Sequence, residues 1–494
     1  MSELRQRTIN GVGWSALSLV GRQGLTFAIG IILARLLSPR EFGLLAMITI
    51  LTSFASIFAE LGFSAALVQK QDVQPAHLSS VFWLNLGMGL LLTLVFIGSA
   101  PLIAGFYHEP ILVPLTMLVS LNFLISSFNI VQNTLMTKSM DFRTLSKVEI
   151  AAAGISGVVA VLMAYIGYGV WSLAMQSVVA TFVTAVVLWF LSGWRPSFTF
   201  SWSAIKDLLG FSGSLFGSKL LNYWVRNLDY LLIGRVLGTG PLGIYNRSYE
   251  IMLMPLNTVS RVLGRVMFPS FSIIQSDKNR VKRTYLQVIR AISLITFPMM
   301  LGLLVTAKPF VLTIFGPKWA GMIPILRIFC LVGMSQSIGT FNGNLYLSQG
   351  RADLQFKVGL VLHTIPLLGI VIGLHWGIIG VASGYAIGSL LIWYPGFYFA
   401  GGLVNLRHGE FFRNLSSVFG CAVFMAAIVW SVELLLPHEW PSWVVMTALA
   451  SFGILIYFSL LYLFKVKTYQ EVRALLSKQW HLWRGRLKRV AVKT

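Results

Sequence analysis

Charged residues that interrupt long apolar stretches are the residues of this sequence most able to do chemistry. Near the middle of a membrane-spanning helix a basic side chain costs about 2.5–3.5 kcal/mol, so such residues are expected to line a wet cavity or to pair. They are Arg22, Glu60, Lys219, Arg226, Asp229, Arg247, Glu250, Arg261, Arg265 and Arg327. Basic residues predominate in this set. Because arginine matches the oxygens of phosphate and carboxylate groups, the set favours binding of an anion.

The spacing of these residues places them on common helix faces. Polar residues recur by threes and fours within two stretches, 208–237 and 241–270, which predicts one polar stripe on each helix. Polar residues of 11–34 and 43–66 form two further stripes. The predicted anion-binding residues are Arg22, Lys219, Asn222, Arg226, Asn257, Arg261 and Arg265.

Three acidic residues, Glu60, Asp229 and Glu250, are the candidates for carrying a coupling ion, since a carboxylate beside arginine changes the charge of a cavity when it is protonated. A simpler alternative is that Arg226–Asp229 and Arg247–Glu250 are neutralising pairs three residues apart. Arg22, Lys219, Arg261 and Arg265 have no such neighbour in sequence, although Arg247 and Arg265 could also reach a helix end.

The elements that position these residues follow from hydropathy. The chain has 494 residues, of which 56% are hydrophobic and 11% charged, and apolar windows predict about 14 membrane spans. The predicted fold class is therefore an all-α polytopic membrane protein. The windows lie at 11–34, 43–66, 79–104, 111–135, 147–166, 170–192, 208–237, 241–270, 286–307, 320–347, 356–374, 377–400, 414–436 and 441–464.

The distribution of basic residues predicts the orientation. Lys and Arg total 38 against 16 acidic residues, for a net charge of +22. If the N-terminus is cytoplasmic, about 25 basic residues fall on the cytoplasmic side and about 5 on the other, as the positive-inside rule requires. Both termini are then cytoplasmic and the number of spans is even, with 12 as the alternative. Because the charge is explained by topology, no nucleic-acid partner is expected.

An internal repeat divides the chain. Ala34–Leu44 aligns with Gly234–Ile244, and a weaker echo pairs 133–148 with 343–358. Parallel repeats form two lobes around a central cavity, which favours an alternating-access transporter over a channel. We therefore expect two pseudo-symmetric six-helix lobes, 1–200 and 201–404, followed by two C-terminal helices in 405–466. The basic tail, 467–494, is predicted to lie as an amphipathic helix on anionic inner-leaflet lipids; a solvated tail is the alternative.

Motifs for enzymatic chemistry are missing from the sequence. It contains no phosphate-binding G-x-x-x-x-G-K-[S/T] and no H-E-x-x-H or paired C-x-x-C. Cys330 and Cys421 lie in apolar stretches, so no metal or other cofactor is expected. The glycine spacings Gly369–Gly373 and Gly380–Gly384 predict close helix packing.

Two regions of the chain, its middle and its start, resemble a known family. Asn227–Gly238, Pro241–Glu250 and Pro269–Ser272, together with Gly13–Trp14 and Ala34–Gly43, are similar to motifs of the polysaccharide-transport branch of the multidrug/oligosaccharidyl-lipid/polysaccharide exporter superfamily. Within that branch the chain is most similar to exopolysaccharide exporters of the colanic-acid type. The similarity of pattern extends over essentially the whole chain.

The resemblance implies a flippase of the bacterial inner membrane. Its expected substrate is an undecaprenyl-pyrophosphate-linked oligosaccharide, such as a repeat unit of colanic acid, O-antigen or a related exopolysaccharide. It also implies rocking lobes driven by a membrane gradient of H⁺ or Na⁺, and polysaccharide polymerase and export machinery as partners. In the sister lipid II flippases the last two helices form a groove for the lipid tail, which implies the same for 414–436 and 441–464.

Other function classes fit less well. An ion-coupled drug or small-molecule exporter of the same superfamily is the main alternative, but cationic drugs would favour an acidic cavity. A polymerase or ligase would carry a large outer loop, and the longest outer connection, near 307–320, is short. A scaffold for polymer assembly is favoured only by the basic tail.

Overall fold

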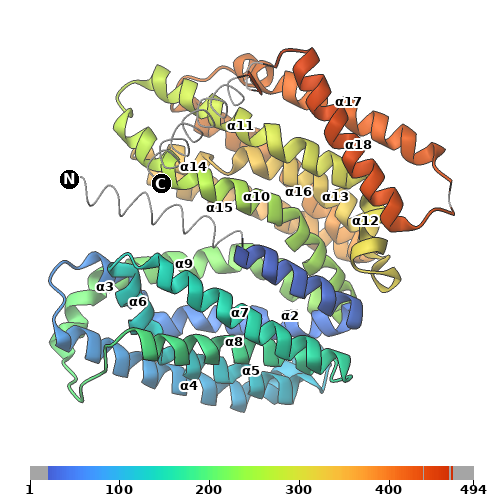
Figure 1. The fold of residues 1–494 in the computed structure, drawn as a ribbon. Coiled ribbons are helices and arrows are strands. Elements are labelled where there is room, and N and C mark those ends of the chain that lie inside the picture. Colours follow the sequence, from blue (N-terminus) through green and yellow to red (C-terminus); the bar gives the residue numbers. More distant parts are fainter. Residues whose placement is uncertain (1–20, 438, 467–468, 471–494) are drawn as a thin grey trace, which may run out of the picture. The chain divides into compact units, whose positions relative to one another are not determined.

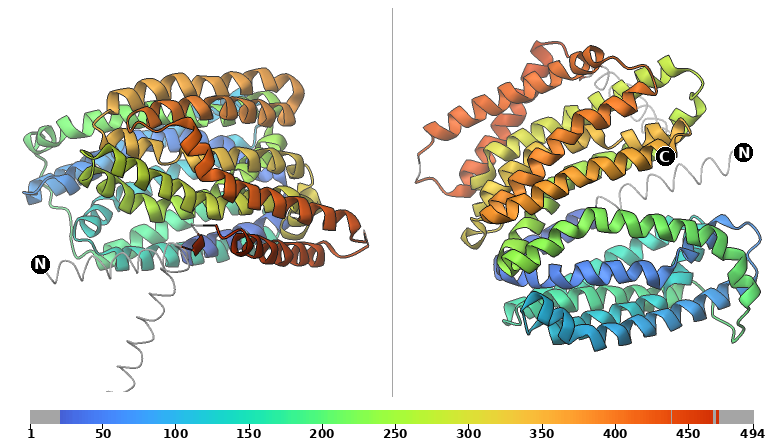
Figure 2. Two further views of the ribbon diagram at one scale, coloured as in Figure 1. Left: turned by 90° about the horizontal axis from the view of Figure 1, so that it is seen from above. Right: turned by 180° about the vertical axis from the view of Figure 1, so that it is seen from behind.

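The computed structural model describes residues 21–437, 439–466 and 469–470, and every regular element in this range is a helix. It does not describe the side chains of residues 210–215, 218–219, 221–222, 225–226, 259, 261–266, 268–270, 352, 360 and 363. The chain forms two compact units, Met1–Asn246 and Arg247–Thr494. In each unit the helices run side by side as a bundle (Figure 1, Figure 2).

The first unit is built around α2, which packs on α4, α5, α8 and α9, while α4 packs on α5 and α7 on α8. Its helices are 21–36, α2 (Pro39–Glu60), α3 (Phe63–Gln69), α4 (Pro75–Tyr107), α5 (Leu112–Ser127), α6 (Ile130–Lys138), α7 (Phe142–Tyr165), α8 (Val170–Leu191), α9 (Trp202–Leu237) and the start of α10 (Thr239–Ile273).

In the second unit α11 packs on α13 and α17, α15 on α16, and α17 on α18. After the rest of α10, its helices are α11 (Lys278–Val305), α12 (Ala307–Ile314), α13 (Met322–Gly339), α14 (Asn342–Ser348), α15 (Ala352–Gly373), α16 (Gly377–Gly402), α17 (His408–Leu435) and α18 (Ser442–Leu463), with short 3₁₀ turns at Pro317–Trp319 and Leu374–Trp376. Its apolar core extends from Phe271 to Val466.

Capping residues explain where several helices begin. Ser38 and Glu41 form a capping box at the start of α2, with the Ser38 amide donating to Glu41 Oε2 at 2.5 Å. Asp141 accepts from the Thr144 amide at 3.1 Å to start α7, and Asp277 accepts from the Arg280 amide at 3.0 Å to start α11. These caps satisfy amides that a helix leaves without intrahelical partners.

Among the described residues, helices coincide with the predicted apolar stretches, but four of the stretches are broken, including 320–347, which is interrupted at Thr340 and Phe341 between α13 and α14. The stretch 43–66 ends as α2 at Glu60, because Leu61 and Gly62 have φ of 47° and 76° before α3 begins. The stretch 111–135 bends by 46° between α5 and α6. The stretch 286–307 ends at Val305, and α12 follows as a separate helix. Hydropathy windows average over such breaks and do not detect them.

Among the described residues, nine helical segments are long and apolar enough to cross a membrane, or up to 10 if α5 and α6 form one bent span. The chain is therefore a multi-pass, all-helical membrane protein. Helix 21–36, α9 and α10 are not among these segments. The larger number of spans and the lobe boundaries expected from the repeat stay predictions.

The predicted close packing at the two glycine pairs is confirmed in α15 and α16. A Cβ placed on Gly369 would lie 2.3 Å from the Gly384 carbonyl oxygen, and one on Gly384 would lie 2.0 Å from that of Gly369. Gly373 and Gly380 face each other in the same way, each with a carbonyl oxygen 2.3 Å from the other's added Cβ. The two backbones approach this closely because neither helix carries a side chain at the contact.

Gly384→Ala is expected to lower the apparent melting temperature in detergent, because the two helices must separate at an overpacking cost of about 1–3 kcal/mol. Gly402→Ala, in the same helix, is the matched control, since no atom lies within 4 Å of an added Cβ there. Its melting temperature should be unchanged or slightly raised. Equal behaviour of the two variants in thermal unfolding followed by size-exclusion chromatography would contradict the packing argument.

Candidate functional site

The two aligned repeat segments meet in the first unit. A Cβ on Gly43 of α2 would lie 1.8 Å from the Thr239 carbonyl oxygen, and a Cβ on Gly243 of α10 would lie 1.9 Å from that of Pro39. Pro39 and Gly43 correspond to Thr239 and Gly243 in the repeat. The contact is thus reciprocal between equivalent residues, and it joins the beginnings of two of the four helices that carry predicted polar stripes.

The polar stripe predicted for α2 is present. Thr49, Ser53 and Ser56 are exposed, while the helix buries Phe42, Met47 and further residues on its other faces. The Thr49 hydroxyl donates to the Leu45 carbonyl at 2.8 Å, and that of Ser56 donates to the Thr52 carbonyl at 2.8 Å. Their hydroxyl oxygens retain acceptor capacity, so this face suits water or a hydroxyl-rich ligand better than lipid.

Aromatic residues of α9 pack on the same helix. Tyr223 donates its hydroxyl to the Ile50 carbonyl at 2.5 Å, and Phe54 contacts the rings of Tyr223 and Trp224 with centroids 5.7 and 4.7 Å apart. Tyr223 follows Asn222 in α9, the helix that carries three of the predicted anion-binding residues. Its packing on α2 therefore holds this part of the α9 backbone in place. No periodicity in the sequence indicates this packing.

Arg22 has a partner that its sequence neighbours do not supply. Its Nη1 lies 3.0 Å from Glu149 Oε2 of α7, and both side chains are partly exposed. A partly exposed ion pair contributes about 0–1 kcal/mol, so an incoming anion can compete for the guanidinium.

Asp229 is buried in the first unit and accepts a hydrogen bond from the hydroxyl of the fully buried Tyr245 at 3.1 Å. No donor among the described residues reaches its other carboxyl oxygen. The pairing of Asp229 with Arg226 considered from sequence cannot be followed, because the Arg226 side chain is outside the described residues. Tyr245 was missed, since it lies on the next helix and no periodicity connects it to Asp229.

Arg247 and Glu250 form the neutralising pair that the sequence offered as the simpler alternative. Arg247 Nη1 lies 2.5 Å from Glu250 Oε2 in the second unit. Asn257 lies exposed further along α10, and Glu60 is the last residue of α2, in the first unit. The side chains of Lys219, Asn222, Arg226, Arg261 and Arg265 lie outside the described residues, so their gathering around one cavity stays a prediction.

A polar cluster in the second unit was also missed. The Tyr249 and Tyr385 hydroxyls lie 3.2 Å apart, and Gln336 donates to the Tyr385 hydroxyl at 3.0 Å. It joins α10, α13 and α16 one residue away from Glu250. Its members are ordinary residues of apolar stretches, and only the packing of three helices brings them together.

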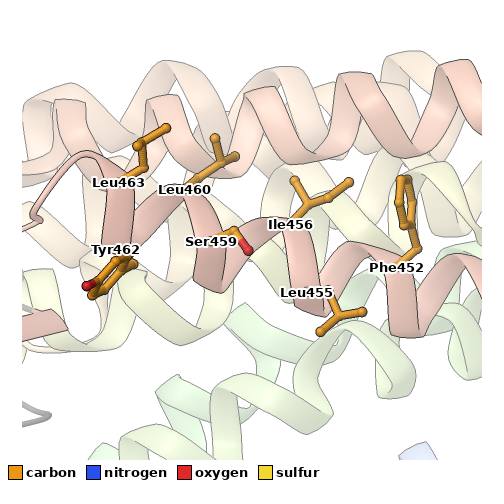
Figure 3. Close-up of a pocket in the computed structure, with 7 residues that line it drawn as sticks. All are labelled: Phe452, Leu455, Ile456, Ser459, Leu460, Tyr462 and Leu463. Atoms are coloured by element: carbon orange, nitrogen blue, oxygen red, sulfur yellow. The ribbon is translucent and has the colours of Figure 1, made fainter.

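A hollow of about 440 Å³ lies on α18 (Figure 3). Apart from Ser459 and the Tyr462 hydroxyl, its lining is hydrocarbon: Phe452, Leu455, Ile456, Leu460 and Leu463. No group of three metal-ligating side chains occurs in the described part of the chain, and Cys330 and Cys421 are buried free thiols.

The family model for polysaccharide biosynthesis proteins matches residues 32–324, which include both repeat segments, α2 and all of α9 and α10. The chain belongs to this family. It is thus a polysaccharide biosynthesis transporter and not an enzyme, as the sequence predicts.

Two similar proteins of the family come from bacteria. The chain is 30% identical to the lipopolysaccharide biosynthesis protein WzxC of Escherichia coli K12, over 79% of each protein. It is also 30% identical to the teichuronic acid biosynthesis protein TuaB of Bacillus subtilis, over 89% of this chain and 91% of TuaB. The fold resembles that of the lipid II flippase MurJ with a TM-score of 0.74, at 14% identity over 93% of this chain and 99% of MurJ.

Proposed function

We propose that the protein moves an undecaprenyl-pyrophosphate-linked oligosaccharide repeat unit from the inner to the outer leaflet of the bacterial inner membrane by alternating access. The observation that carries the proposal is the exposed polar face of α2, in a helix whose other faces are largely buried or partly buried in the first unit. Sugars need such hydrogen-bonding surface within the membrane. Relatives of this family named for lipopolysaccharide and teichuronic acid biosynthesis support a glycan substrate.

The pyrophosphate is assigned to Arg22, Lys219, Arg226 and Arg261. A wet basic cavity removes most of the cost of moving a multiply charged headgroup through hydrocarbon. Arg22 exchanges Glu149 for the headgroup in this scheme, at little cost because the pair is partly exposed. The excess of cations disfavours a drug exporter for cationic compounds.

The polyprenyl tail stays in hydrocarbon, and the apolar hollow on α18 offers it a surface (Figure 3). In this proposal about 14 spans form the lobes 1–200 and 201–404 with two further helices in 405–466. Both termini are cytoplasmic, as the basic residues suggest.

The test is leaflet translocation in proteoliposomes that contain a polyprenyl-pyrophosphate oligosaccharide, measured by its accessibility to an impermeant glycosidase with and without a pH or Na⁺ gradient. Saturable movement by the protein, and none in empty liposomes, is expected. If folded protein moves no native lipid-linked oligosaccharide under either gradient, the proposal is wrong. Movement of a cationic dye instead would favour the drug-exporter alternative.

Asp229→Asn is expected to keep the fold but to remove stimulation by the gradient, because the amide retains the acceptor for Tyr245 and loses the ionisable group. Tyr245→Phe is the matched variant. It leaves a buried carboxylate oxygen without this donor, so the free energy of unfolding should fall by about 1–3 kcal/mol. A gradient response in Asp229→Asn equal to that of the unchanged protein would assign Asp229 a structural role alone.

A further inference from the structure

A basic groove of about 820 Å³ lies in the second unit, and none of its lining residues belongs to the predicted anion-binding set. It runs between α11 and α17, which pack on each other, and Val466 lines it just beyond α18. Four basic side chains, Lys282, Arg283, Arg290 and Arg413, line it together with one acidic side chain, Glu410. The groove therefore carries a net positive charge.

An ion pair crosses the groove and accounts for its one acidic residue. Lys282 Nζ lies 3.0 Å from Glu410 Oε2, which ties α11 to α17. Arg283, Arg290 and Arg413 remain as positive charges without a carboxylate partner among the described lining residues. Three like charges that face one groove repel one another, and an anion bound between them relieves this repulsion.

Arg290 is held in place for such an anion. The Asn414 side-chain oxygen accepts from Arg290 Nε at 2.7 Å and also from Nη2, and the Asn414 amide nitrogen donates to the Leu286 carbonyl at 3.0 Å. Asn414 is neutral, so it orients the guanidinium without cancelling its charge. Since the guanidinium carries five N–H donors, several remain for a ligand in the groove.

The floor of the groove is apolar. Val418 and Val466 are buried, and Leu286 is partly buried beside them. The basic rim and the hydrocarbon floor together fit an amphipathic anion better than free phosphate. Both α11 and α17 begin on the side that the basic residues predict to be cytoplasmic, where basic pockets between helices meet lipid headgroups.

We propose that this groove binds the phosphate headgroup of an anionic phospholipid of the cytoplasmic leaflet, with its glycerol and first methylene groups on the floor of the groove. Arg290 and Arg413 bind the phosphate, and Arg283 adds to the positive electrostatic potential of the groove. The site rests on the predicted orientation of the chain and not on the transported substrate. It is a resident-lipid site that stabilises the α11–α17 contact.

The test uses full-length protein in detergent and native mass spectrometry with phosphatidylglycerol, and with phosphatidylcholine as the zwitterionic probe. Phosphatidylglycerol should bind and raise the apparent melting temperature, and Arg283→Gln/Arg413→Gln should weaken its binding by about tenfold or more. Both arginines are exposed, so the double variant should fold. Arg280→Gln/Arg407→Gln is the matched control: it removes the same charge from exposed residues of the same segments outside the groove.

Each outcome decides the proposal. Equal phosphatidylglycerol binding by the double variant and the unchanged protein would overturn it. So would an equal loss of binding in the Arg280→Gln/Arg407→Gln control, because the effect would then depend only on the net charge of the protein. Millimolar inorganic phosphate that displaces phosphatidylglycerol and gives the same rise in melting temperature would make free phosphate the ligand. Binding of undecaprenyl pyrophosphate with clear preference over phosphatidylglycerol would instead make the groove part of the transport path.

Discussion

Arg226→Ala and Arg261→Ala are each expected to reduce translocation of the lipid-linked oligosaccharide by on the order of a hundredfold, while the protein stays folded in the membrane. A charge-assisted hydrogen bond contributes about 1.5–3 kcal/mol, and each factor of ten corresponds to about 1.4 kcal/mol. The loss of translocation should be larger than when an exposed basic residue is removed, because attraction to a pyrophosphate is poorly screened away from bulk water. The glycosidase-accessibility assay measures it directly.

Two controls separate this role from packing and net charge. Arg226→Lys keeps the charge but not the two-pronged geometry, so it should recover part of the rate. Arg280→Ala removes a basic residue that is exposed near the start of α11 and should transport normally. Full export by both alanine variants would remove the two arginines from the binding site.

The helices could be predicted from sequence because hydropathy is a local property. The stretch 79–104 corresponds to α4, which extends to Pro75–Tyr107 with proline in its first turn and left-handed His108 at its end. Hydropathy does not predict a break that depends on the backbone conformation of one or two residues. Leu61 and Gly62, for example, end α2 in the left-handed region inside an apolar stretch. A window average does not register a single dihedral angle.

For the candidate site, the sequence predicts which helix faces are polar but not which residues of neighbouring helices they contact. The α2 stripe follows from three- and four-residue spacing, and Arg247–Glu250 pair as spacing allows. Arg22–Glu149, Asp229–Tyr245 and the cluster at Tyr385 each depend on which helices are neighbours. With a single sequence that information is absent, so periodicity identifies polar faces but not their partners.

The sequence repeat is the exception, because it has a direct structural counterpart. Its weaker echo runs from α6 into α7 and from α14 into α15, so both echo segments follow a break in a span. Its stronger part forms the reciprocal contact of Gly43 with Thr239 and of Gly243 with Pro39. The two aligned segments therefore contribute equivalent residues to the two sides of one contact.

Gly43→Ala and Gly243→Ala are accordingly expected to be severely destabilising. An added Cβ would meet a backbone carbonyl at 1.8 or 1.9 Å, and no side-chain rotation can relieve that overlap. The starts of α2 and α10 must separate, at about 3 kcal/mol or more, the upper end of overpacking costs. We expect little monodisperse protein after solubilisation, measured by fluorescence size-exclusion chromatography.

Gly240→Ala is the matched control, because it lies in the same first turn of α10 and no atom lies within 4 Å of its added Cβ. It should yield as much folded protein as the unchanged chain. Since Gly43 and Gly243 share one contact, separating the helices for the first alanine also makes room for the second. The double variant should therefore cost much less than the sum of the two single variants. Additive losses would mean that the glycines act at independent sites, and the pseudo-symmetric contact would then not be one structural unit.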